Sequence, residues 1–145
     1  MALKVELKPG ERIILGECVI TNDDQRTRLY IEGDAPILRE KDILTPKTAN
    51  TPAKRIYLSI QLMYLSSEPT SDYSAYFTLI REMIKAAPST IPYVDRMNNL
   101  ILTNTYYKAL KEAKALIAYE QELLAYAKPG GTGLRPNGGP NRKSA

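Results

Sequence analysis

Hydrophobic and polar positions alternate with a period of two through the first forty residues of the chain. Leu3, Val5 and Leu7 are separated by charged residues, which is typical of a strand with one buried and one solvated face. Further short apolar segments lie between turn residues, at positions 11–15, 18–21, 26–32 and 37–39. Two of them are joined through Gly16-Glu17, which indicates a tight hairpin. Five such segments predict a small antiparallel sandwich or barrel-like unit.

From Thr51 onward the apolar residues recur every three or four positions, which is the spacing of a helix. Thr51-Pro52 supplies a capping residue followed by proline at the first helical position, for a helix that extends to about Leu65. Three more helices follow: one that ends before Pro88, one that Thr90 caps, and a longest one from Asn104 or Thr105 to about Ala127. The apolar stripe of the last helix contains one acid, Glu120.

These patterns predict an α+β fold. A small N-terminal antiparallel β unit of about five strands occupies residues 1–50, and a region of about four helices occupies residues 51–127. Residues 128–145 are rich in glycine and proline and contain one aliphatic residue, so we expect this tail to be disordered.

The net charge of +4 invites a nucleic-acid interpretation, so its distribution matters. Residues 1–50 have a net charge of −1 and residues 51–127 a net charge of +1, whereas the tail carries four basic residues and no acid. The folded part is therefore nearly neutral, and any surface that binds a nucleic acid has to be a local patch.

Several kinds of chemistry are absent from the sequence. It contains no histidine and one cysteine, which excludes Ser-His-Asp sites, histidine-containing metal sites and zinc ribbons. We expect no enzyme activity, no metal and no cofactor. Cys18 is expected to be a buried packing residue. The neighbouring acids Glu40 and Asp42, like Glu120 and Glu122, are expected to be solvated.

The single cysteine and the lack of a long apolar run both bear on location. One cysteine cannot form an internal disulfide, and no segment approaches the roughly 18 apolar residues of a membrane helix. A leader with a basic and then an apolar segment is also not found at the start of the sequence. We therefore expect a cytoplasmic protein without a membrane segment.

The strand half offers two candidate binding sites. Arg26, Arg28 and Tyr30 share one face of a predicted strand, and stacking on an aromatic ring combined with arginine contacts to phosphate is how many proteins hold single-stranded RNA. The alternative is an ordinary solvated strand face. The second candidate is Arg39 at a strand end, whose planar donors suit a phosphate or a base edge. An ordinary surface charge is the alternative there too.

One long stretch of the chain runs from LKPGERIILGECVIT through RTRLYIEGDAPILREKDIL to RIYLSIQLMYL, and two later segments read LTNTYYKAL and IAYEQELL. Together these segments resemble the flagellum biosynthesis repressor family, FlbT. The resemblance covers residues 1 to about 124. It implies a post-transcriptional regulator that associates with the 5′ untranslated region of a flagellin message and promotes decay of that message. Flagellin mRNA is then the expected partner, with a flagellar regulatory protein as a possible second one.

The segments GERIILGECVIT, RTRLYIEGDAP and LREKDI also resemble the carbon storage regulator family of small RNA-binding proteins. That resemblance implies RNA contacts from the first strand and from an arginine at the end of the fifth strand. Arg39-Glu40 matches this arginine and the acid after it, with Leu38 where the family has histidine. Lys8 matches one of two basic positions before the Gly-Glu pair, and Leu7 replaces the other.

Two functional hypotheses remain open. The first is an RNA-binding regulator that uses Arg39 and Lys8, with Arg26, Arg28 and Tyr30 as a second set. The other is an adaptor that binds a flagellin, a chaperone or a flagellar regulator through the helical half, which holds nine of the ten tyrosines. Most of these tyrosines can equally be core residues. We expect a homodimer, because a small sheet buries little alone and its edges need partners.

Overall fold

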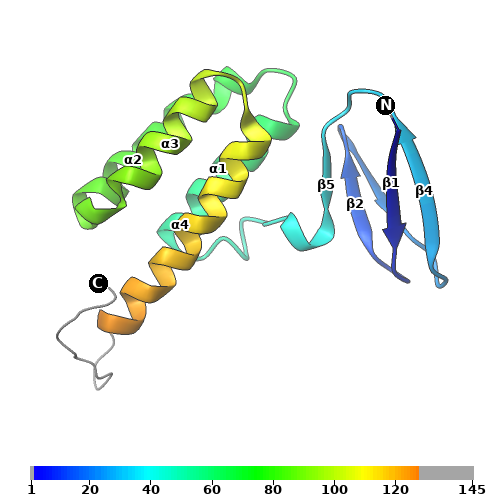
Figure 1. Cartoon of the computed structure of the whole chain (residues 1–145), viewed down its shortest axis with the longest axis horizontal. Helices are drawn as coiled ribbons and strands as arrows, with labels where there is room; N and C mark the ends of the chain where they lie inside the picture. Colours follow the sequence, from blue (N-terminus) through cyan, green and yellow to red (C-terminus); the bar gives the residue numbers. More distant parts are fainter. Residues whose placement is uncertain (1, 128–145) are drawn as a thin grey trace.

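The computed structural model describes residues 2–127, in which a group of strands lies beside a group of helices (Figure 1). The predicted α+β class is confirmed. The strands are β1 (Ala2–Leu7), β2 (Arg12–Leu15), β3 (Cys18–Thr21), β4 (Thr27–Glu32) and β5 (Ile37–Arg39). The helices are α1 (Pro52–Leu65), α2 (Tyr73–Ala86), α3 (Ile91–Leu102) and α4 (Tyr106–Ala127). The predicted disorder of the tail concerns residues outside the described range.

The five strands form two antiparallel sheets. β1 pairs with β4 over their full lengths, and the second sheet has the order β3-β2-β5. The hairpin between β2 and β3 places Leu15 opposite Cys18, so Gly16-Glu17 is a two-residue turn as predicted. Gly16 has a φ of 62°, a conformation that glycine adopts without a steric penalty. Pairing of the first strand with the fourth, by contrast, joins segments that are distant in sequence.

The sheet β3-β2-β5 lies between the β1-β4 ribbon and the helices, as Figure 1 shows. Val5, Leu7 and Ile13 form a small core between the two sheets. Ile14 and Leu38, which are opposite each other on β2 and β5, instead pack against the helical core. Around Ile13, Ile14 and Leu38 the middle sheet is thus apolar on both faces, because each face is covered there by a different layer.

Three side chains of α1 attach the helices to the segment that contains β5. The hydroxyl of Tyr64 accepts a hydrogen bond from the Ile37 amide at 3.1 Å and donates to the Ile37 carbonyl at 3.0 Å. Gln61 bonds the amide and the carbonyl of Leu44 in the same way, both at 2.9 Å. Tyr57 donates to the carbonyl of Asp42 at 2.6 Å. These bonds satisfy main-chain groups that no strand pairs.

The helix boundaries follow most of the expected signals. Thr51 caps α1, since its hydroxyl oxygen accepts a hydrogen bond from the Lys54 amide at 3.2 Å. Thr90 occupies the N-cap position of α3 as predicted, but its side chain makes no capping hydrogen bond to the helix. A short 3-10 turn, Pro88–Thr90, leads into α3, and the Thr90 hydroxyl donates to the Ala87 carbonyl instead.

Two predictions of burial in the strand half are wrong. Leu3 is 48% exposed, unlike Val5 and Leu7 on the same face of β1. Cys18 is an exposed free thiol. β3 is the edge strand of its sheet, and only Ile20 of its four residues packs against the small core, so nothing covers Cys18.

Candidate nucleic-acid interface

The outer face of the β1-β4 ribbon carries the first predicted set of residues. Arg28 and Tyr30 are exposed on β4, and Tyr30 retains 67% of its accessible surface. The register places Lys4 opposite Tyr30 and Glu6 opposite Arg28. Directly opposed side chains on one face lie close enough to interact, so an aromatic ring here has a lysine as its neighbour across the strands.

Arg28 is partly neutralised by its partner on β1. One of its terminal nitrogens lies 3.4 Å from a carboxylate oxygen of Glu6, and both side chains are about half exposed. Arg26 precedes β4 and lines a shallow depression together with Glu6, Thr27 and Arg28. The structure therefore brings two arginines to the same acid. An exposed ion pair of this kind is weak, so its arginine remains available to a competing phosphate.

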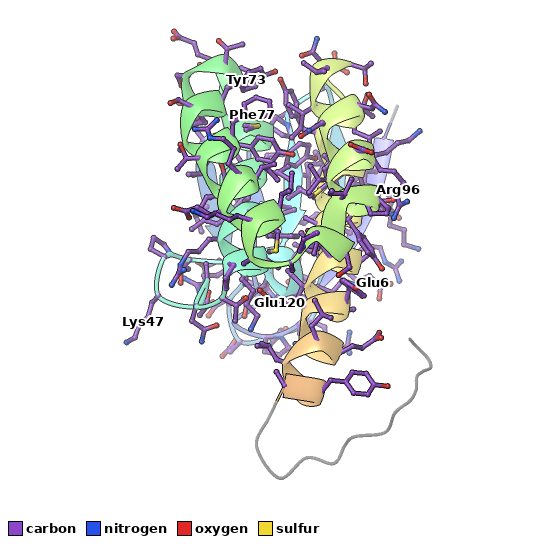
Figure 2. All side chains as sticks on the ribbon, turned by 90° about the vertical axis from the view of Figure 1, so that its left-hand side faces the viewer. Glu6, Lys47, Tyr73, Phe77, Arg96 and Glu120 are labelled. Atoms are coloured by element: carbon purple, nitrogen blue, oxygen red, sulfur yellow. The ribbon has the colours of Figure 1, made fainter. Side chains whose placement is uncertain are left out.

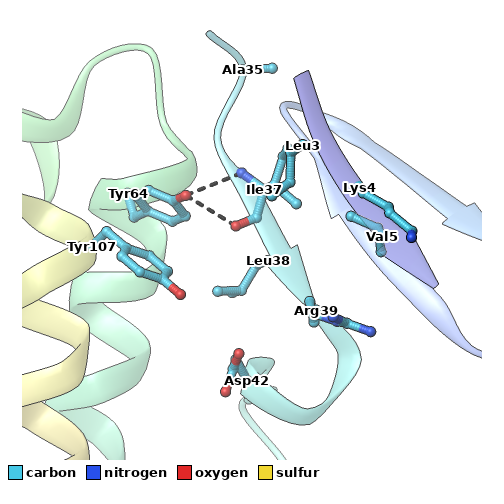
Figure 3. Close-up of a pocket in the computed structure, with 10 residues that line it drawn as sticks. All are labelled: Leu3, Lys4, Val5, Ala35, Ile37, Leu38, Arg39, Asp42, Tyr64 and Tyr107. Atoms are coloured by element: carbon cyan, nitrogen blue, oxygen red, sulfur yellow. Dashed lines mark hydrogen bonds between the residues drawn. The ribbon is translucent and has the colours of Figure 1, made fainter. Parts of the chain in front are cut away.

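Arg39 lies at the end of β5 and points toward β1 (Figure 3). Its Nη2 donates a hydrogen bond to the main-chain carbonyl of Glu6 at 2.8 Å. The side chain also lines a pocket of about 390 Å³ between β1, β5 and the helices. Tyr64 and Tyr107 form the helical wall of this pocket. No acid within residues 2–127 forms an ion pair with Arg39.

Lys8 lies at the same end of the β unit as the segment that follows Arg39. It is exposed and lines a depression with Pro9, Gly10, Glu11, Glu40 and Lys41. Its main-chain groups are fixed, because its amide donates to the Glu11 carboxylate at 2.8 Å and its carbonyl accepts from Asn22 at 2.7 Å. Its ammonium group carries no ion pair within the described residues.

Glu6 is the residue on which the two predicted sets converge. Its carboxylate pairs with Arg28 from β4, and its carbonyl accepts from Arg39 of β5. Lys4 completes this basic neighbourhood and was not among the predicted contacts. The period of two placed it on the same face as Lys8, but the position opposite Tyr30 depends on the register between β1 and β4, which no local pattern contains.

Leu38 shows how this chain differs from the carbon storage regulator pattern. It occupies the position where that family has histidine, and it is only 1% exposed, in the core beneath the helices. Adjacent residues of a strand point to opposite faces, which directs Leu38 toward the helices and Arg39 toward β1. Of these two residues, only Arg39 therefore remains a candidate contact at this strand end.

Two of the four paired carboxylates, Asp42 and Glu120, are not the solvated charges that the sequence suggested, whereas Glu40 and Glu122 are exposed as predicted. Asp42 pairs with Lys114 of α4, and its side chain is only 12% exposed. Glu40 accepts from the Arg12 amide at 2.6 Å. Glu120 is 7% exposed, because α4 carries it under the start of α1. Among residues 2–127 no group of three or more acidic or cysteine side chains is placed to hold a metal ion.

The tyrosines of the helical half are mostly core residues, as one of the two interpretations held. Tyr57 and Tyr76 are buried, five others pack at the edge of the core, and Tyr107 and Tyr126 are exposed. Burial raises the pKa of Tyr57, Tyr64 and Tyr76 above the usual 10.0. These phenols stay protonated at neutral pH and serve as fixed hydrogen-bonding groups. None of the helices between residues 2 and 127 has the length and apolar character required to cross a membrane.

Known proteins resemble this chain over most of its length. Residues 3–124 match the family described as "Flagellar protein FlbT". The chain is 59% identical, over 124 residues and 85% of each chain, to the probable flagellum biosynthesis repressor protein FlbT 1 of Bradyrhizobium diazoefficiens. It is 54% identical to the probable repressor FlbT of Rhodopseudomonas palustris, over 86% of this chain and 99% of the relative. The flagellum biosynthesis repressor protein FlbT of Caulobacter vibrioides is 35% identical, over 90% of this chain and 94% of its own. No solved structure matches the chain.

Proposed function

Because this chain belongs to the flagellar protein FlbT family, we propose that it is a repressor of flagellum biosynthesis that acts by binding RNA. It associates with the 5′ untranslated region of flagellin mRNA through the outer face of its β unit. Binding promotes degradation of the message. The protein contributes recognition only, and the cleavage of RNA belongs to a separate nuclease.

The observation that carries this proposal is the convergence of Arg28 and Arg39 on Glu6. Arg28 approaches from β4 and Arg39 from β5, so two guanidinium groups flank one short stretch of β1. Lys4 and Arg26 add charge on the same ribbon. The folded part, although nearly neutral overall, thereby gains a local basic surface of the kind that phosphate binding requires.

Tyr30 supplies the second element of single-strand recognition. Its ring is largely exposed on a flat strand face, with Lys4 directly opposite. An unpaired base can stack on such a ring while the neighbouring cations hold the phosphates on either side. The surface therefore suits a single-stranded leader rather than a regular RNA duplex.

The proposal includes a homodimer. Two copies would present two basic ribbons to one RNA, which raises the apparent affinity without new contacts. The outer edges of β3 and β4 have no strand beside them within the described residues, and such edges are available for pairing between copies.

Titration of a labelled flagellin leader RNA at several salt concentrations tests the proposal. We expect the logarithm of the affinity to fall linearly with the logarithm of the salt concentration, with a slope of about −3 for four to five phosphate contacts. Arg39→Ala and Arg28→Ala should each weaken binding by about 1–3 kcal/mol. Arg96→Ala is the matched control, because Arg96 is a half-exposed arginine in a surface ion pair on α3. If neither strand variant differs from this control, the proposed surface is wrong.

A further inference from the structure

The helical half contains an apolar groove that the RNA proposal does not use. It has a volume of about 590 Å³ and lies between the C-terminal half of α2, the start of α1 and the end of α4. Leu79 and Met83 of α2 line one wall, and Leu123 and Leu124 of α4 line the other. Leu124 at the rim is 55% exposed. A volume of this size is within the range of sites that hold ligands.

Glu120 is a buried acid on the wall of this groove. It comes from α4, and Figure 2 shows it beside the end of α2. Its Oε2 accepts a hydrogen bond from the Ala53 amide at 2.9 Å, at the first turn of α1. Its Oε1 is buried and has no hydrogen-bond partner within the described residues. One oxygen of the carboxylate is therefore satisfied and the other is not.

Capping of α1 explains the position of only one of the two carboxylate oxygens of Glu120. A carboxylate at a helix N-terminus is stabilised by the free amides and by the helix dipole, which explains the bond from Ala53. A single hydroxyl or amide oxygen would serve that purpose without a second buried acceptor. An unpartnered buried carboxylate oxygen is costly, and buried polar groups in native proteins are nearly always paired. The free Oε1 lies at the wall of a groove with a mainly apolar lining, and it points to a donor that is supplied from outside.

We propose that this groove binds a short amphipathic helical segment of a partner protein, whose aliphatic side chains fill the apolar walls and whose lysine or arginine donates to Oε1 of Glu120. The inference is independent of the RNA proposal, since it concerns the opposite part of the chain. The groove is a second binding site, for protein rather than for nucleic acid.

The dimensions and charge of the groove favour this occupant. The lining residues of α2 extend from Leu79 to Ala86 and those of α4 from Glu120 to Ala127. At 1.5 Å per residue each wall is about 10–12 Å long, which matches two turns of a helix with apolar residues at i, i+3, i+4 and i+7. The charged residues that line the groove are two acids, Glu82 and Glu120, and one base, Arg55. The groove therefore attracts a basic segment and repels phosphate.

Fluorescence anisotropy with two labelled synthetic peptides tests the inference on the full chain. Both peptides are amphipathic helices with a leucine stripe, and they differ at one central position, which is lysine in one and norleucine in the other. We expect the lysine peptide to bind saturably. Glu120→Gln keeps an acceptor for the Ala53 amide and removes the charge, so it should weaken the lysine peptide about tenfold and leave the norleucine peptide unchanged.

A pair of surface variants provides the control for the groove itself. Leu124→Ser should weaken both peptides severalfold, because Leu124 forms the exposed rim. Leu102→Ser, on the 66% exposed Leu102 at the end of α3, should change neither affinity. Should Glu120→Gln fail to fold, the preference of the wild-type chain for lysine over norleucine still tests the role of the acid.

Three results would overturn the inference. The first is a lack of saturable binding of either peptide, and the second is an equal affinity of the wild-type chain for both. The third is a different occupant. If Leu134→Ser in the tail raises peptide affinity about tenfold, the chain's own tail fills the groove. If sedimentation shows a dimer that Leu124→Ser dissociates, a second copy fills it.

Discussion

The guanidinium group of Arg39 donates to the main-chain carbonyl of Glu6 at 2.8 Å, although β5 and β1 belong to different sheets. This side chain thus links the two sheets at a point where no strand pairing joins them. Arg39 has both a structural and a proposed RNA-binding role, because a guanidinium group has five donors and this bond uses one. The two roles can be separated by experiment.

Arg39→Met should lower the free energy of unfolding by about 1–2 kcal/mol, since it removes the charged donor that links β5 to the Glu6 carbonyl and keeps the aliphatic stem. Arg28→Met removes only an exposed ion pair and should lower it by less than about 1 kcal/mol. Urea unfolding of both variants measures the difference. A loss from Arg28→Met as large as that from Arg39→Met would contradict the structural role of Arg39.

Tyr64→Phe should destabilise the contact between the β unit and the helices. The hydroxyl of Tyr64 bonds both main-chain groups of Ile37, so its removal leaves a part-buried amide and carbonyl without a partner. We expect a loss of about 1–3 kcal/mol in urea unfolding and faster hydrogen exchange at the Ile37 amide. Tyr107→Phe is the matched control from the same pocket, because Tyr107 is 46% exposed. Unchanged exchange at Ile37 in Tyr64→Phe would show that the bond is not maintained in solution.

Local patterns were sufficient to predict the elements of this fold but not their partners. The alternation around Val5 and Leu7, the two-residue turn at Gly16 and the cap at Thr51 all depend on neighbouring residues, and all are confirmed. The pairing of β1 with β4 depends on the whole β unit. For this reason the sequence indicated Arg28 and Tyr30 as one face and left Lys4 out.

The wrong predictions of burial for Glu120 and Cys18 also arise because burial depends on residues that are distant in the sequence. The sequence placed Glu120 in the apolar stripe of the last helix but gave no reason to expect a buried charge, because the Ala53 amide that binds it lies 67 positions away along the chain. Burial of Cys18 was inferred from the pattern of its own strand, whereas exposure depends on whether a second layer covers that strand. Periodicity identifies an apolar face, and only the tertiary arrangement decides which faces are covered.

The exposure of Cys18 makes a simple prediction about thiol chemistry. An accessible thiol on an edge strand should react with a disulfide reagent in the native protein, at one equivalent per chain and without denaturant. The release of the coloured thiolate measures the reaction, and Cys18→Ser is the control that should release none. Reaction only after the addition of denaturant would instead place Cys18 inside the fold.

The hydrogen bond between Tyr73 and Tyr106 predicts a loss of stability at alkaline pH. Their hydroxyl oxygens are 2.9 Å apart, and burial, together with the bond to Tyr73, raises the pKa of Tyr106 from 10.0 to about 12. Between these values the folded chain keeps a proton that the unfolded chain has lost. The free energy of unfolding should therefore be constant below pH 10 and should fall as the pH rises toward 12.

Urea unfolding at a series of pH values from 8 to 12 measures this dependence. The buried phenols of Tyr57 and Tyr76 contribute in the same direction, because burial raises the pKa of each. Tyr106→Phe should reduce the slope of the free energy of unfolding against pH by the equivalent of about one proton between pH 10 and 12. The reason is that it removes one of the groups whose pKa differs between the folded and the unfolded chain. Tyr73→Phe keeps the Tyr106 phenol but removes its hydrogen-bond partner, so it should reduce the slope by a smaller amount. A slope that neither variant changes would mean that the tyrosine pair does not persist in the folded protein.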